Sequence, residues 1–373
     1  MYRKFINIFS FLSAFLPQLA FGEVNIAVIA PKEGEFQRLG SEIIEGVKIG
    51  VSEINSNGGL NGEKINLITV DDQCNDRLAI STAQMMALNS SSKDKMNLVI
   101  GPYCSNAFQQ VADVYAKAGI FQIIPTSISA QTAKGSNYKG LVKLVGFSES
   151  QGRDFFNFFK KHFSGLNLAM VYDSEQPDSI SVAKIVQSEF VSSSIPGNFL
   201  VYNLAEYKND EDILAQDILD DGGQAAYILG NPQRVAKLAR YLKEEKRKFT
   251  IFTNRYQSQA SYDEILGSLS EGAYVIGLPS LKDNPDFTET LVNLRLRGIE
   301  PQGLAVYGYS AVKLWEKLVQ KADSFSYAKL SNLINKEKVD LVWGETMFTN
   351  GNPNKSISYS IYQIRNGEYT QVY

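Results

Sequence analysis

Small polar side chains follow two apolar runs of the chain, at positions where they could bind an anion. Ser105 comes shortly after the run 97–100, and Thr126 and Ser127 come directly after the run 120–124. Hydroxyl groups and free backbone N–H groups in such turns bind carboxylates or phosphates by hydrogen bonding alone. The spacing therefore indicates a binding site, and we find no catalytic apparatus in it.

The segment after Ser105 predicts a helix. Apolar residues recur at helical spacing from Asn106 to Lys117, and Gly119 is a suitable stop. The first backbone N–H groups of a helix have no partner in the helix, and its dipole favours an anion there. Serine is also a preferred helix cap, so Ser105 is an anion ligand, a cap, or both.

Alternating strands and helices position these turns. We predict strands at residues 24–30, 64–70, 97–100, 120–124 and 141–145, with a helix capped by Ser41 after the first strand. A second series follows a crossing at residues 146–152, with strands at 166–171, 199–204, 225–229, 249–253 and 273–277. This order predicts an α/β fold with parallel sheets covered by helices, whose ligands bind at the carboxyl ends of the strands. Near the C-terminus, Asn366-Gly367 predicts a hairpin.

Length, composition and charge favour a soluble protein of two domains. The chain has 373 residues, of which 44% are hydrophobic and 21% charged, and its net charge is −3. This charge disfavours nucleic acid and anionic membrane as partners. Residues 1–22 have the basic start, apolar middle and small-residue end of a cleaved signal peptide, so we expect a periplasmic protein that begins at Glu23.

The two cysteines, Cys74 and Cys104, are expected to form a disulfide, because the chain is exported. Each follows a predicted strand, so the bond would join two turns of the site and add about 3 kcal/mol of stability. His162 is the single histidine, which disfavours zinc and a catalytic Cys–His pair. Asp71 and Asp72 could bind a metal, although a helix cap is the simpler role. We expect no cofactor and no metal.

An exported hydrolase is one alternative. The sequence has no Gly-x-Ser-x-Gly elbow, and His162 lies beside two lysines near a predicted helix end. We therefore expect no enzyme activity.

Several short motifs resemble one known family when taken together. They are A-V-I-A-P, I-N-S-N-G-G-L-N-G, D-D-Q-C, I-G-P-Y-C-S, P-T-S-I-S, E-S-Q-G and L-S-E-G-A-Y. In this order, with both cysteines, they resemble the type I periplasmic binding proteins of ABC importers, in the leucine/isoleucine/valine-binding group. The resemblance implies two Rossmann-like lobes joined by a three-segment hinge, the arrangement called a Venus flytrap. We place the first lobe at residues 23–145 plus 279–348 and the second at 146–278 plus 349–373.

The resemblance also implies ligand contacts in the first lobe. In this family a serine after the second cysteine, here Ser105, holds the α-carboxylate of the ligand. The next polar turn contributes through Thr126, Ser127 and Ser129. The family's apolar contact before the first helix falls on Leu39.

The second lobe departs from the family pattern. The family's cleft tyrosines fall near Gln176 and Asn231 in this chain. Its glutamate, which holds the ligand's ammonium group, falls on Arg255. A guanidinium cannot hold an ammonium, so Arg255 is either a ligand contact of another kind or the partner of a carboxylate such as Glu149 or Glu175.

The resemblance implies a solute-binding protein of an ABC importer. Its partners would be a small solute, either an amino acid or a related carboxylate, and an ABC permease in the inner membrane, and it would act as a monomer. A sensory module that reports the same ligand to a receptor is the main alternative.

Overall fold

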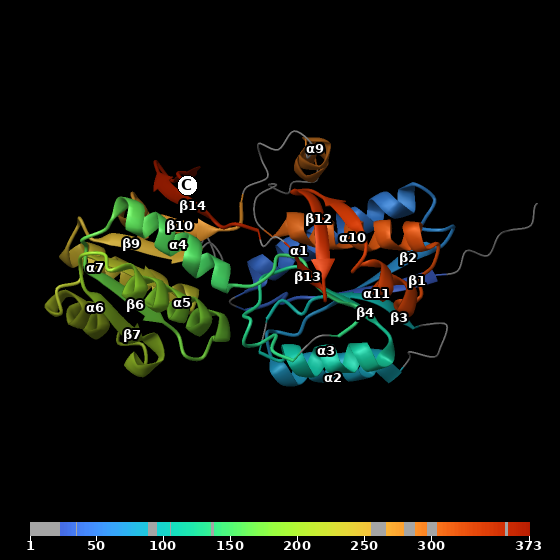
Figure 1. The fold of residues 1–373 in the computed structure, drawn as a ribbon, viewed down its shortest axis with the longest axis horizontal. Helices are drawn as coiled ribbons and strands as arrows, with labels where there is room; N and C mark the ends of the chain where they lie inside the picture. The colour runs from blue at the N-terminus through green and yellow to red at the C-terminus, as the bar shows by residue number, and fades with distance from the viewer. Residues whose placement is uncertain are drawn as a thin grey trace, which may run out of the picture.

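The computed structural model describes residues 23–34, 36–88, 95–104, 106–135, 138–254, 266–279, 288–296, 304–354 and 357–373. The described elements form two lobes that lie side by side, each built around its own sheet (Figure 1). Within these residues, no helix is both long and apolar enough to cross a membrane. Residues 1–22, expected to be a signal peptide, lie outside the described part of the chain.

A five-stranded parallel sheet forms the centre of the first lobe. Its order is β2-β1-β3-β4-β5. The strands are β1 (Glu23–Ile29), β2 (Lys64–Val70), β3 (Met96–Ile100), β4 (Phe121–Ile124) and β5 (Leu141–Lys143). Four of them are buried along most of their length, as expected for a parallel sheet covered on both faces, whereas the edge strand β2 is mostly part-exposed.

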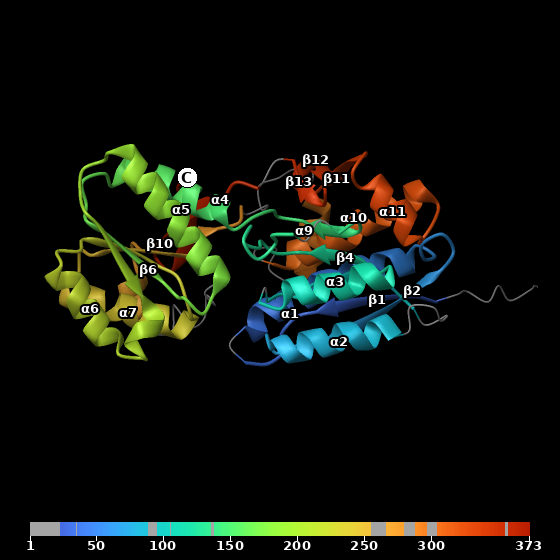
Figure 2. The same ribbon diagram turned by 60° about the horizontal axis from the view of Figure 1, so that its bottom comes forward.

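Helices cover both faces of this sheet. On one face lie α2 (Asp76–Leu88) and α3 (Phe108–Ala118), side by side (Figure 2). The other face carries α1 (Gln37–Ser56), α10 (Ala305–Ala322) and α11 (Tyr327–Leu333). Gly119 ends α3 in the left-handed conformation, as predicted. The prediction that Ser41 caps α1 is wrong, because α1 begins four residues earlier and contains Ser41.

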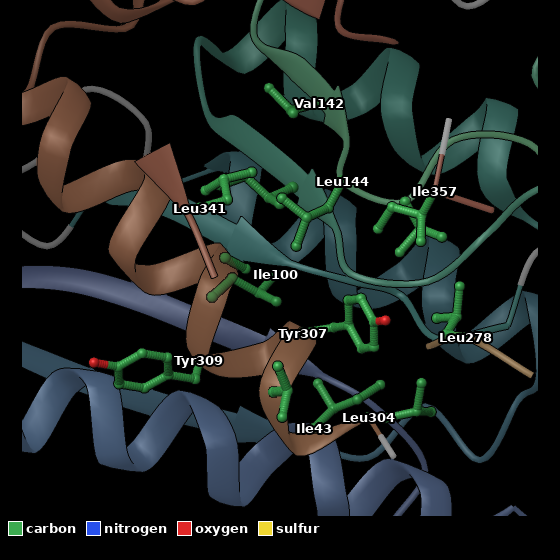
Figure 3. Packing of buried hydrophobic residues seen from close by; sticks show 14 of the residues in the cluster. Ile43, Ile100, Val142, Leu144, Leu278, Leu304, Tyr307, Tyr309, Leu341 and Ile357 are labelled. Atoms are coloured by element: carbon green, nitrogen blue, oxygen red, sulfur yellow. The ribbon is translucent and has the colours of Figure 1, made fainter. Parts of the chain in front are cut away.

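The helices α1 and α10 pack closely because glycines lie at their contact. A Cβ atom on Gly46 would lie 1.9 Å from the carbonyl oxygen of Ala305, and one on Gly308 would lie 2.4 Å from that of Ile43. The apolar cluster around this contact includes Ile43, Leu304 and Tyr307, and it extends to Leu278 and Ile357 (Figure 3). The contact joins segments that are distant in sequence, because α1 lies in the early part of the chain and α10 in its later part.

A small antiparallel sheet completes the first lobe. It consists of β11 (Lys338–Leu341), β12 (Gly344–Thr349) and β13 (Asn352–Pro353), none of which the sequence pattern predicted. The loop between β12 and β13 joins it to the main sheet, because the N–H of Lys143 donates to the carbonyl of Gly351 (2.7 Å). The lobe boundary expected before residue 349 therefore falls inside the hairpin of β12 and β13.

The second lobe is built on a seven-stranded mixed sheet of order β15-β14-β10-β9-β8-β6-β7. Its strands are β6 (Leu168–Tyr172), β7 (Phe199–Asn203), β8 (Ala225–Ile228), β9 (Thr250–Asn254), β10 (Tyr274–Gly277), β14 (Ser360–Arg365) and β15 (Glu368–Gln371). The strands from β6 to β10 are parallel, and β14 and β15 are antiparallel to their neighbours. The hairpin predicted at Asn366-Gly367 is confirmed, since both residues have positive φ.

Helices flank the second sheet as well. The pair α4 (Glu149–His162) and α5 (Pro177–Ser193) packs together, as does the pair α6 (Glu211–Asp220) and α7 (Pro232–Glu245). The remaining described elements are α9 (Thr288–Leu296) and two short 3₁₀ helices, Leu204–Tyr207 and Gly267–Ser270.

Three segments pass between the lobes, and side chains tie each of them to its surroundings. At the first crossing, Glu149 accepts the backbone N–H of Ala130 (2.8 Å). At the second, the carbonyl of Leu278 accepts the hydroxyl of Tyr362 (3.1 Å), and at the third the N–H of Tyr359 donates to Asp154 (2.7 Å). The last of these bonds holds the third segment against α4.

Candidate functional site

A cavity of about 360 Å³ lies where the two lobes face each other. The first lobe and its neighbouring loops contribute Phe36, Cys74, Tyr103, Cys104, Asn106, Thr126, Ser127 and Ser148. The second lobe contributes Gln151, Asp173, Glu175, Gln176, Pro177, Asp178, Ser179, Val182, Leu229, Gly230, Asn231 and Asn254. Most of these residues lie at carboxyl ends of strands or at the starts of the helices that follow, as the sequence predicted.

The disulfide joins two turns of the first-lobe wall. Cys74, after β2, is bonded to Cys104, after β3, and their Cα atoms are 5.3 Å apart. Both cysteines line the cavity, as does Asn106, next to the start of α3. Ser105 lies outside the described residues, so its role stays a prediction.

The turn after β4 supplies the second polar group of this wall. Thr126 and Ser127 line the cavity, in agreement with their predicted position. Ser129 is fully buried, and its hydroxyl donates to that of Thr132 (2.7 Å) while accepting the N–H of Thr132 (3.0 Å). Ser129 therefore stabilises the turn and does not contribute to the described cavity wall.

Aromatic side chains form the apolar part of the first-lobe wall. The rings of Phe36 and Tyr103 lie 6.0 Å apart, centre to centre, and both residues line the cavity. Leu39, predicted to make the apolar contact, lies instead inside α1 and is buried in the core of the lobe. The error follows from placing the start of α1 at Ser41, because the residue just before the observed helix is Phe36.

The turn between β6 and α5 forms the most polar part of the second-lobe wall. The N–H of Asp173 donates to the hydroxyl of Ser179 (2.9 Å), and Oδ1 of Asp173 accepts the N–H of Glu175 (3.0 Å). These bonds hold Glu175, Gln176 and Asp178 along the cavity. Gln176 is thus on the cavity wall, as predicted, but its acidic neighbours were not singled out from the sequence.

Asn231 lines the cavity and also caps a helix. Its side-chain oxygen accepts the N–H groups of Gln233 (3.0 Å) and Arg234 (3.2 Å) at the start of α7. The preferred cap residue and the following proline explain why the helix begins here. These bonds fix the side-chain oxygen of Asn231 at the start of α7, on the cavity wall.

Asn254 is the last residue of β9 and lines the cavity. Its side-chain oxygen is buried and has no hydrogen-bond partner among the described residues. Arg255, the next residue, lies outside the described part of the chain, so its predicted contact stays a prediction.

The residues near the first crossing connect the cavity to the hinge. The hydroxyl of Ser148 donates to Asp178 (3.3 Å), and the amide of Gln151 donates to the hydroxyl of Tyr227 (2.6 Å). Tyr227 is fully buried and stacks on Phe155, with ring centres 4.0 Å apart. These bonds join the start of α4, next to the first crossing, to β8 and to the turn before α5.

Asp71 and Asp72 brace the turn that carries Cys74. Asp71 accepts the N–H of Gln73 (2.8 Å), and Asp72 accepts that of Cys74 (3.2 Å). Burial raises the pKa of Asp72. The cap of α2 is Asn75, so the expectation that one of the aspartates caps this helix is wrong. Across the described residues, no cluster of three or more His, Cys, Asp or Glu side chains could hold a metal ion.

Two α/β lobes with a polar cavity at their facing strand ends define a binding protein of the hinged, two-lobed class. The family model described as "Periplasmic binding protein" matches residues 23–368. The chain therefore belongs to this family, as a type I periplasmic binding protein of the leucine/isoleucine/valine-binding group. The family resemblance seen in the sequence is confirmed.

Individual relatives are distant but similar over almost their whole length. An amino acid binding protein of Pseudomonas aeruginosa is 24% identical, over 95% of this chain and 93% of that protein. The Leu/Ile/Val-binding protein of Escherichia coli is 21% identical, over 91% and 90%. Among solved structures, a leucine binding protein from Thermotoga maritima has a TM-score of 0.81 at 20% identity, covering 94% of this chain and 98% of that one.

A further solved structure shows that the identity of the ligand cannot be transferred to this chain from the fold alone. A solute binding protein from R. palustris, in complex with benzoate, has a TM-score of 0.76 at 16% identity, over 94% of this chain and 96% of that one. The fold is shared, whereas one of these proteins is a leucine binding protein and the other holds benzoate. The ligand of this chain has to be argued from its own cavity.

Proposed function

We propose that this protein is the periplasmic solute-binding component of an ABC importer, and that it binds an amino acid or a related small polar solute between its lobes. The observation that carries the proposal is the cavity of about 360 Å³, whose walls come from both lobes. Its size is at the lower end of the range for small-molecule pockets. Binding in such a cavity needs no bond to be made or broken.

The first-lobe wall suits two parts of a solute. The start of α3 and the hydroxyls of Thr126 and Ser127 suit a carboxylate. Phe36 and Tyr103 offer an apolar surface beside it. We place Ser105 and Arg255 at the same cavity as proposals, because their neighbours Cys104, Asn106 and Asn254 line it.

Closure of the lobes around the solute would convert binding into a signal for transport. The three crossing segments form a hinge, and a closed form buries the solute and presents both lobes together to a permease. We also propose that residues 1–22 are removed as a signal peptide when the protein is exported, and that the protein acts as a monomer.

A thermal-shift screen of the mature chain, residues 23–373 with the disulfide intact, tests the proposal. The panel holds the common amino acids, their amines and carboxylic acids, amides and polyamines. A solute at 100 times its dissociation constant adds about 2.7 kcal/mol to the free energy of unfolding, which gives an easily measured shift. A chain that responds to none of these solutes would contradict the proposal.

A further inference from the structure

A buried carboxylate faces the cavity from the second lobe. Asp173 follows β6 and is only 4% exposed, yet it lines the cavity. Its Oδ1 accepts one backbone N–H, from Glu175 at 3.0 Å. Within the described part of the chain, Asp173 forms no ion pair with a lysine or arginine.

The surroundings of Asp173 add negative charge. Glu175 and Asp178 line the same part of the cavity, and the described lining residues include no lysine, arginine or histidine. Space is kept open beside the carboxylate by Gly230, where a Cβ atom would lie 3.4 Å from Oδ2 of Asp173 and 2.7 Å from Leu204.

The wall of the first lobe complements this charge. The aromatic pair of Phe36 and Tyr103 lines the same cavity. Aromatic faces attract a cation, and carboxylates pair with it. A solute with a carboxylate and no positive group would be repelled by three carboxylates of the second-lobe wall, those of Asp173, Glu175 and Asp178.

Among the described residues Asp173 has no counter-ion, and a buried carboxylate in that position is unfavourable, because it has lost its hydration and regains only part of that free energy from hydrogen bonds. A ligand with the opposite charge would stabilise this group. We propose that Asp173, supported by Glu175 and Asp178, holds a positively charged nitrogen of the solute. This inference rests on the proposed function and narrows the solute to zwitterionic or cationic amines.

The proposed ammonium site lies at the turn between β6 and α5, whereas the family resemblance implies a site at the end of β9. The family resemblance implies a glutamate after β9, where this chain has Arg255. That residue lies outside the described part of the chain and has no part in the inference. The turn of Asp173 is a different element of the same wall, so the two sites are distinguishable by mutation.

Calorimetry on matched solutes tests the charge requirement. Each amino acid is compared with the amine that lacks its carboxylate and with the acid that lacks its ammonium, for example L-leucine with isopentylamine and 4-methylpentanoate. We expect the solutes that bind to carry a positive nitrogen, and the corresponding acids to bind at least about 30-fold more weakly, as for loss of one partner of a buried charge pair.

The variant Asp173→Asn tests the residue. Its amide oxygen can still accept the N–H of Glu175, so the turn keeps its hydrogen bond while the charge is lost. We expect the affinity for the best zwitterion or amine to fall about 30-fold or more, and the melting temperature without solute to stay equal or rise. The control Asp212→Asn, at an exposed position on α6 in the same lobe, should change neither quantity. If Asp173→Asn does not fold, the double variant Glu175→Gln/Asp178→Asn carries the test, with a loss of about 10-fold or more expected.

The possible outcomes separate the two proposals. Tight binding of acids or uncharged solutes with unchanged affinity in Asp173→Asn would overturn the inference and leave the proposed function standing. A lower melting temperature with unchanged affinity would make Asp173 a turn residue only, with the same consequence. A wild-type chain that binds no member of the panel would contradict the proposed function and the inference together.

Discussion

Lys143 shows how strongly the environment of one residue can differ from what its type suggests. It lies at the end of β5 and is only 2% exposed. Burial lowers the pKa of its ammonium group from 10.5 to about 8. The charged form is therefore less favourable in the folded protein than in the unfolded chain.

The sign of the resulting pH dependence follows from the lowered pKa of Lys143. Between pH 8 and 10.5 the unfolded chain binds a proton that the folded protein has released, so stability rises with pH across this window. Below pH 8 both states are charged, and the folded state carries the full desolvation cost.

We expect Lys143→Met to raise the free energy of unfolding at pH 7 by about 3 kcal/mol, since the apolar side chain has no charge to desolvate. The gain should shrink as the pH approaches 10.5. Urea unfolding at pH 7, 8.5 and 10 measures it, with the exposed Lys139→Met as control. A gain that does not depend on pH would show that packing, and not charge, is responsible.

Individual cavity residues were predicted unevenly. Thr126 and Ser127 could be placed on the wall because they follow a recognisable strand, whereas Gln176 and Asn231 were placed there by the family resemblance. Phe36 was missed because the sequence gives no sharp signal for the start of α1: its N-cap residue makes no side-chain cap hydrogen bond. Asp173 lies beside Gly230, which is distant from it in sequence, so no local pattern could reveal its burial.

At the scale of elements, the contact of α1 with α10 sets a strict limit on side-chain size. Gly46 and Gly308 meet backbone carbonyls of the facing helix, whereas Gly50 meets only the side chain of Val312, at 2.9 Å. A backbone atom cannot move aside without moving its helix, while a side chain has some freedom to adjust.

We therefore expect alanine substitutions to destabilise the protein in the order Gly46, Gly308, Gly50. Gly46→Ala should cost about 3 kcal/mol or more, since the helices must separate. Differential scanning calorimetry of the three variants measures the order. Equal effects at Gly46 and Gly50 would mean that the helices separate easily at this contact.

The disulfide has a structural and a functional consequence, because both cysteines line the cavity. Its loop has a sequence separation of 30, and opening it by Cys74→Ser/Cys104→Ser should cost about 3 kcal/mol of stability. We also expect weaker solute binding, since two turns of the first-lobe wall lose their connection. Denaturation and calorimetry of the double variant measure both effects. Reduced wild type is the matched control, and it should behave like the variant.

Most elements could be predicted from the sequence, because buried parallel strands are continuous apolar runs with clear turns between them. The strand β2 was predicted to the residue. The sheet of β11, β12 and β13 was not predicted, since its strands alternate between exposed and buried residues over only a few positions. Such short strands are stabilised by their place in the lobe, and local sequence carries little of that information.

At the scale of the whole molecule, two lobes joined by three segments allow a hinge motion that small-angle X-ray scattering can measure. We expect the radius of gyration to fall when a solute found in the screen is added at saturation, because closure brings the lobes together. At about three times the wild-type dissociation constant, most of the wild type is bound, whereas Asp173→Asn should stay close to the value of the unliganded protein, because a 30-fold weaker affinity leaves only about a tenth of it bound. An unchanged radius in the liganded wild type would mean that the cavity binds without closure.

The strand order of the second lobe also bears on how the protein is made. β10 is completed by β14, and α1 by α10, so each lobe needs residues from the later part of the chain. While the chain is synthesised from its N-terminus, one edge of β10 stays unpaired until residues 360–365 have been made. A nascent chain therefore holds neither a finished lobe nor a solute, and until then it exposes an edge on which a chaperone or another chain could pair.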